Sequence, residues 1–74
     1  MTKEEFRFLI DTKKPFEFSY KNKNYNLTFG KDDQGKEYIA FGERYMQKNY
    51  YSWGELMNQA KVENSFLREM LEEL

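Results

Sequence analysis

Cysteine and histidine are both absent from the 74 residues of this chain. Without cysteine there is no disulfide and no thiolate metal site, so burial or self-association must stabilise a domain this short. Without histidine, the usual zinc sites and imidazole general bases are excluded as well. The four scattered glycines do not assemble into a phosphate-binding loop. We therefore expect a non-enzymatic protein with no catalytic residues, no metal and no cofactor.

Long apolar segments are also missing. The longest unbroken apolar run is "YIAF", from Tyr38 to Phe41, whereas a membrane-spanning helix needs about 20 such residues. The amino-terminal "MTKEEFRFLI" carries two glutamates and no apolar stretch of signal-peptide length. These features predict a single cytoplasmic domain, residues 1–74, with no membrane partner.

Aromatic and charged residues are abundant instead. Phenylalanine, tyrosine and tryptophan make up 19% of the chain, and such large rings can fill a core in a short sequence. Residues 13–48 hold eight basic and five acidic side chains, whereas residues 49–74 hold two basic and five acidic ones. The net charge of -1 argues against a generally basic nucleic-acid binder, but the uneven distribution leaves room for a local basic patch.

The first segment has the pattern of a short helix. Thr2 and Glu5 have the spacing of a capping box, in which each side chain binds the other residue's free amide. An apolar stripe at helical spacing follows them. The pattern predicts a helix from Lys3 to Ile10 or Asp11.

From Phe16 the apolar period changes to two, which is typical of a strand. A two-residue turn at Asn22 and Lys23 would return the chain as a second strand and set Phe18 opposite Leu27. A slip of one residue would oppose aromatic rings with polar side chains. The pattern therefore predicts a β-hairpin.

The stretch "DDQGK" predicts a second hairpin turn, with Gly35 in the left-handed conformation. This turn would set Ile39 opposite Phe29, while Asp32 and Asp33 would accept hydrogen bonds from local amides. Together the two turns assign eight apolar side chains to one face of a three-stranded meander: Phe16, Phe18, Tyr20, Tyr25, Leu27, Phe29, Ile39 and Phe41. The opposite face is polar or small and is predicted to be open to solvent.

Helical spacing returns after Ser52, with apolar stripes over residues 53–60 and 67–74. The linker between them is expected to bury Val62 and to place Asn64 in a left-handed conformation. The sequence thus predicts an α+β fold in two layers, αβββαα: an N-terminal helix, a three-stranded antiparallel meander and two C-terminal helices packed on one sheet face. It leaves open whether residues 44–50 extend the third strand and turn, or are irregular.

The stretch "NYYSWGEL" places three rings within four positions. A second capping box beginning at Ser52 would make Tyr51 and Leu56 the two positions of a hydrophobic staple. Trp53 opens the next helical stripe. Tyr50 alone is left without a structural role.

The candidate binding surface is Tyr38, Arg44, Tyr45, Lys48 and Tyr50. Exposed rings beside basic side chains are what single-stranded nucleic-acid binding requires, because bases stack on the rings while the cations bind phosphates. The favoured hypothesis is nevertheless a protein-interaction or accessory module, with an unknown protein or a second copy as partner, because two edge strands, an open sheet face and leftover rings are available for docking. Weak single-stranded nucleic-acid binding through this surface is the alternative.

Three stretches, "KKPFEFSYKNKNYNLTF", "YIAFGERY" and "SWGELMNQAKVENSFLREML", resemble a loose group of short proteins from Gram-positive bacteria and their mobile elements. The likeness covers most of the chain and lies in core and turn residues. It departs from the group at Asn22-Lys23 and at Asn64, where glycine-containing turns are expected. The resemblance implies a bacterial origin and the fold above, and it implies no known activity.

Overall fold

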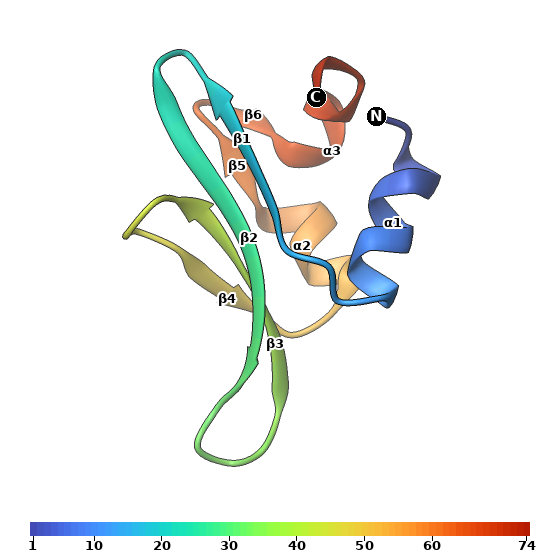
Figure 1. The fold of residues 1–74 in the computed structure, drawn as a ribbon, viewed down its shortest axis with the longest axis vertical. Coiled ribbons are helices and arrows are strands. Elements are labelled where there is room, and N and C mark those ends of the chain that lie inside the picture. The colour runs from blue at the N-terminus through green and yellow to red at the C-terminus, as the bar shows by residue number, and fades with distance from the viewer.

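The computed structural model describes residues 1–74 as a mixed α+β domain whose helices lie on one side of an antiparallel sheet (Figure 1). The sheet has four strands in the order β1-β2-β3-β4, so β1 and β4 form its edges. The elements in chain order are α1 (Lys3–Asp11), β1 (Phe16–Tyr20), β2 (Lys23–Lys31), β3 (Glu37–Glu43), β4 (Lys48–Tyr50), α2 (Trp53–Gln59), β5 (Lys61–Val62), β6 (Ser65–Phe66), α3 (Leu67–Met70) and a final 3-10 turn (Leu71–Glu73). No helix combines the length and the apolar character that crossing a membrane requires.

The sheet has one strand more than the predicted meander. After β3 the chain reverses in a tight turn over residues 44–47 and returns as β4, which sets Tyr50 opposite Ile39. The predicted three-stranded order is therefore wrong. A three-residue strand carries too little alternation to be recognised from its sequence.

The C-terminal region also differs from the prediction. Residues 61–66 form a small β5–β6 hairpin whose left-handed residue is Glu63, at φ 59°, and not Asn64. The hairpin takes up the residues before Leu67, so the last helix is a single α-turn continued by a 3-10 turn. Val62 is fully buried, as predicted.

The register of the second hairpin is the predicted one, and that of the first is shifted. Ile39 faces Phe29, and Gly35 is left-handed at φ 82°. In the first hairpin the turn residues are Lys21 and Asn22, at φ 50° and 66°, so Phe18 faces Tyr25. This shift moves each partner by two residues, which leaves every side chain on the predicted face.

The core is a single cluster of buried side chains between the sheet and the helices. All eight side chains assigned to the apolar sheet face are either buried in this cluster or packed against it. Helix α1 begins at the predicted capping box and contributes Phe6 and Ile10. Phe6 is fully buried, and its ring centroid lies 5.9 Å from that of Trp53 on α2. The predicted apolar face is therefore confirmed.

Gly42 and Gly35 both have positive φ but differ in their surroundings. At Gly42, φ is 153° and an added Cβ would lie 3.1 Å from backbone atoms of Met46 and Gln47; at Gly35 no atom lies within 4 Å of such a Cβ. We expect Gly42→Ala to lower the free energy of unfolding by about 3 kcal/mol, through backbone strain plus overlap. Gly35→Ala should lower it by about 1 kcal/mol, through strain alone. Urea unfolding measures both, and equal losses would contradict the close approach at Gly42.

Candidate functional site

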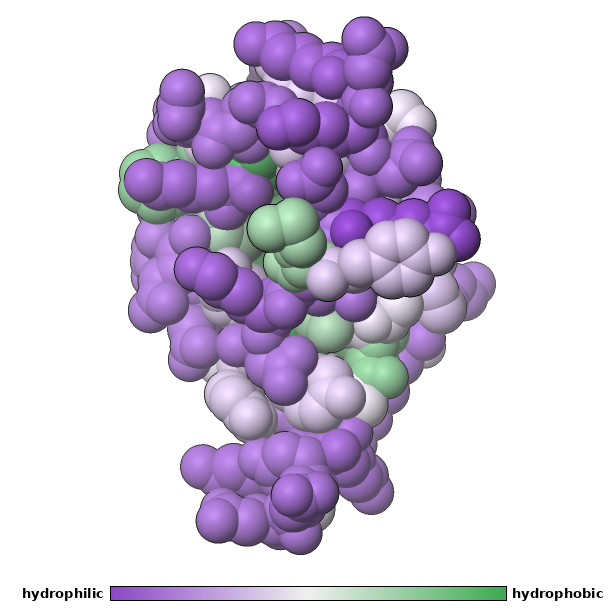
Figure 2. Space-filling view, turned by 90° about the vertical axis from the view of Figure 1, so that its left-hand side faces the viewer, coloured by the Kyte–Doolittle hydropathy of each residue, from purple (hydrophilic) through white to green (hydrophobic).

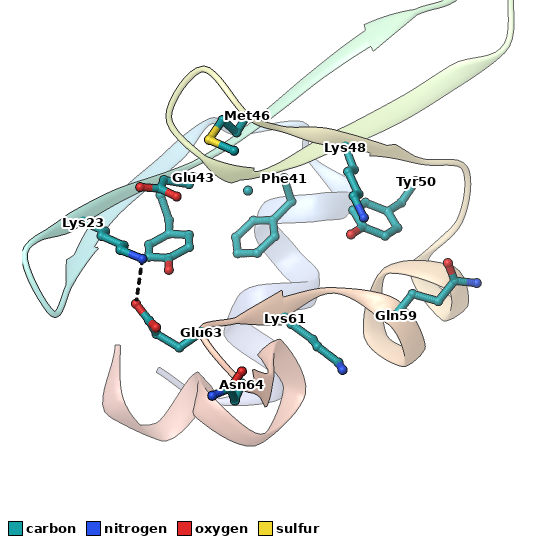
Figure 3. A pocket seen from close by; sticks show the side chains of 12 residues that line it. Lys23, Phe41, Glu43, Met46, Lys48, Tyr50, Gln59, Lys61, Glu63 and Asn64 are labelled. Carbon is teal, nitrogen blue, oxygen red and sulfur yellow. Dashed lines mark ion pairs between the residues drawn. The ribbon is translucent and has the colours of Figure 1, made fainter.

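A groove of about 390 Å³ lies between the β3–β4 end of the sheet and the β5–β6 hairpin (Figure 3). Its wall on the sheet side is aromatic, because Tyr25, Phe41 and Tyr50 all project from the core face. These three rings are buried, with exposed fractions of 5%, 2% and 7%. Tyr25 and Phe41 stack on each other with a centroid distance of 6.3 Å. The wall therefore belongs to the core and offers the groove little free ring surface.

The charged side chains around the groove divide between its two ends. At one end the ammonium of Lys23 lies 3.4 Å from a carboxylate oxygen of Glu63, and this contact, with a further contribution from Glu43, raises the pKa of Lys23 (Figure 3). Toward the other end lie Lys48 and Lys61, which make no ion pair. The ammonium of Lys61 lies 5.1 Å from the ring centroid of Phe66. One end of the groove thus carries one lysine and two glutamates, and the other end carries two lysines.

The turn between β3 and β4 projects beside this groove and carries two exposed apolar side chains, Tyr45 at 88% and Met46 at 72%. The guanidinium of Arg44 lies 5.2 Å from the ring centroid of Tyr45, and Met46 also lines the groove. We call Arg44, Tyr45 and Met46 the tip. Figure 2 views the molecule from the side on which the tip projects in Figure 1, and apolar patches lie near the centre of that face within a hydrophilic surround.

The backbone of the tip is held in an unfavourable conformation. The amide of Met46 donates to the carbonyl of Glu43 at 2.8 Å, which closes the turn. Tyr45 is left-handed within it, at φ 70°, a conformation that glycine adopts without penalty and that costs a tyrosine roughly 1 kcal/mol or more. A strained aromatic residue that is almost fully exposed contributes little to folding, so the tip is a candidate for a binding role.

The structure divides the five predicted site residues between two faces of the sheet. Lys48 and Tyr50 lie on the core face and line the groove, and Tyr45 occupies the adjoining tip. Arg44 borders a separate hollow on the open face together with Glu17 and Ser19, and Tyr38 lies farther along that face, opposite Gly30. The five therefore do not form one continuous surface.

The exposure expected for Tyr50 is wrong, because its ring is buried opposite Ile39. Burial is also the main cause that raises the pKa of its phenol. The adjacent Tyr51 is the exposed ring, at 44%. Residues of a strand alternate between its faces, and β4 directs Tyr50 inward. Of the pair, Tyr50 is the core residue.

Tyr51 packs on the open face and does not form the predicted staple with the buried Leu56. Its ring meets that of Tyr38 edge-on, at a centroid distance of 6.4 Å and an interplanar angle of 74°. Its hydroxyl donates to Asp32 Oδ2 at 3.3 Å. Ser52 does accept a hydrogen bond from the amide of Glu55, at 3.0 Å, so it is the N-cap of α2, but the return bond from the Ser52 amide to the Glu55 side chain that would complete the predicted capping box is not formed.

Of the two turn aspartates predicted to bind local amides, Asp32 does so and Asp33 does not. The Oδ1 of Asp32 accepts hydrogen bonds from the amides of Gln34 and Lys36, both at 2.9 Å. These bonds, together with the hydroxyl of Tyr51, hold the pKa of Asp32 below its ordinary value of 3.8. No group of three or more acidic side chains is placed to hold a metal ion.

The lowered pKa of Asp32 predicts a pH-dependent contribution to stability. Because the carboxylate is bonded in the folded state, its contribution is complete above the ordinary pKa of 3.8 and is lost as the pH falls through the lower, folded value. We expect Asp32→Asn to be less stable than the wild type at neutral pH and the difference to shrink as the pH falls below 3.8 and through the folded pKa. Thermal unfolding over this pH range provides the test, and a difference that widens toward acid would contradict the assignment.

The groove residues that were not predicted from the sequence include Lys23, Lys61 and Glu63. Lys23 lies about 40 residues from Lys61 and Glu63 in the sequence. The three side chains come together because the β5–β6 hairpin packs against the sheet, and no local sequence pattern predicts this packing. Met46 could have been found from the sequence, because Tyr45 and Met46 are two large apolar residues inside a polar turn segment.

Comparison with protein-family models, with curated proteins and with solved structures finds no match for this chain.

Proposed function

We propose that this chain is a non-enzymatic protein-interaction module whose binding site is the tip together with the adjoining groove. The observation that carries the proposal is the pair of exposed apolar side chains, Tyr45 and Met46, held on a closed turn at the mouth of a groove. Tyrosine, arginine and methionine are enriched at protein interfaces relative to the remaining surface. The tip consists of these three residue types.

Its conformation supports the same role. A turn closed by a backbone hydrogen bond leaves the backbone at Tyr45 with little freedom to lose on binding. The strain at Tyr45 means that the residue is not optimal for stability. Such a conflict between local stability and residue choice is common at functional sites.

Single-stranded nucleic acid fits the same site less well. Base stacking requires ring faces open to solvent, whereas the three aromatic rings of the groove are buried. Tyr45, the most exposed ring, already has the guanidinium of Arg44 near it. Nucleic-acid binding is therefore the weaker candidate, supported only by the lysines around the groove. A cytoplasmic location and a bacterial origin remain predictions from the sequence.

Selection from a displayed library of random peptides tests the proposal. We expect enriched peptides whose addition shifts the amide resonances of residues 44–48 in a two-dimensional NMR spectrum of the labelled protein. The affinities should be micromolar, since a site of this size offers few contacts. A library that yields no binder, or binders that shift resonances only on other surfaces, would contradict the proposed site.

A further inference from the structure

We infer that the groove takes an extended, acidic peptide segment that adds to the sheet as a strand beside β4. This inference rests on the proposed interaction role and names the kind of partner. β4 is an edge strand with β3 as its one partner. The outer edge of such a strand presents backbone amides and carbonyls that a further strand can pair with.

The groove lies where the side chains of an added strand would project. Lys48 and Tyr50 point from β4 toward the core side and form part of the groove wall, as their sticks in Figure 3 show. Asn49, between them, points to the open face. An added strand has the same alternation, so every second side chain would enter the groove mouth and the others would face solvent. Backbone pairing and side-chain insertion are thus available in one binding mode.

The positive charge of the lysines near β4 favours an added segment that carries acidic side chains. Lys48 and Lys61 lie toward the same end of the groove and have no ion-pair partner, whereas Lys23 is already paired with Glu63. An acidic side chain entering at the β4 end would meet the ammonium groups of Lys48 and Lys61, neither of which has a carboxylate partner. A second copy of this chain paired through its own β4 would add another Lys48 to this short edge and bring no acidic side chain from β4 to pair with the lysines. An acidic peptide from another protein is therefore the favoured occupant.

The opposite edge of the sheet is less suited to strand addition. β1 begins directly after Pro15, and lysines flank it at positions 14 and 21. Proline has no amide hydrogen to donate, so Pro15 limits strand pairing at the start of β1, and β4 has no proline. No residue of β1 lines the groove, so an added strand there would gain no comparable side-chain site.

N-methylation of the tightest selected peptide tests strand addition. One version carries N-methyl groups on its odd-numbered residues and the other on its even-numbered residues, so that the two are closely matched in composition. Successive amides of a strand point to opposite edges, and only one edge would pair with β4. We expect one version to bind about tenfold more weakly than the unmodified peptide and the other to bind within about twofold of it. Equal losses in both versions, or no loss in either, would overturn strand addition and leave the proposed interaction role standing.

Charge is tested in the same binding assay. We expect Lys48→Gln and Lys61→Gln each to lower the affinity for the selected peptide by up to about fivefold. The control Lys36→Gln, on a turn outside the groove, should leave the affinity unchanged. The selected peptides should be rich in aspartate and glutamate. Selection of basic or helical peptides, or a thymidine oligonucleotide that displaces the peptide and binds more tightly, would overturn the acidic-strand inference. Failure to select any peptide would count against the interaction role itself.

Discussion

Replacing Phe6 by alanine is expected to remove a large share of the stability of the protein, whereas replacing Phe8 is expected to have little effect. Phe6 is fully buried and packs against Trp53, while Phe8, two residues along the same helix, is 58% exposed. Removing a buried phenylalanine costs about 3–5 kcal/mol through lost burial and the cavity that remains. A domain of this length has a total stability of only about 4–10 kcal/mol, so this loss removes a large share of it.

Urea unfolding followed by circular dichroism measures both variants. Phe8→Ala is the matched control, because it makes the same chemical change in the same helix and should alter the free energy of unfolding by less than about 0.5 kcal/mol. Equal losses for the two variants would mean that α1 does not pack into the core through the face that carries Phe6.

Tyr50→Ala is expected to destabilise the protein by about 3 kcal/mol and Tyr51→Ala by about 1 kcal/mol. Tyr50 is 7% exposed and contributes to the core opposite Ile39, so its removal leaves a cavity beneath the edge strand. Tyr51→Ala removes only an edge-on contact with Tyr38 and an exposed hydrogen bond to Asp32. The expected losses of stability at these neighbouring positions therefore differ because the two rings lie on opposite faces of the sheet.

Thermal and urea unfolding of the two tyrosine variants decide this assignment. A larger loss for Tyr51 than for Tyr50 would place Tyr51 in the core, as the predicted staple does, and would contradict the register of β4. That result would also remove Tyr50 from the groove wall and so change the candidate site.

The apolar face of the sheet could be predicted from the sequence because two independent turn signals agreed on it. The predicted register of the first hairpin was wrong by two residues, but a shift of two residues leaves every side chain on the same face of the sheet. The prediction of the apolar face was therefore unaffected. The turn itself was misplaced because Lys21 and Asn22 both adopt positive φ without glycine, and no residue there indicates which pair forms the turn.

The candidate site was harder to predict because it depends on short elements. β4 has three residues, and β5 and β6 have two each, lengths at which no hydrophobic period can be recognised. These elements decide that Tyr50 is buried and that Lys61 and Glu63 lie across from Lys23 and Lys48. Sequence reasoning did find Tyr45 and Lys48, but grouped them with Tyr38, which lies on the other face.

The Tyr45→Gly variant tests whether the tip binds a partner at a cost to the stability of the fold. The variant removes the exposed ring and also relieves the left-handed strain, so we expect a free energy of unfolding that is unchanged or higher by up to about 1 kcal/mol. The affinity for the selected peptide should fall by about tenfold or more, as for a residue central to an interface. Phe8→Ala, which removes an exposed ring elsewhere, should change neither quantity. A Tyr45→Gly protein that binds the peptide as tightly as the wild type would contradict this role of the tip.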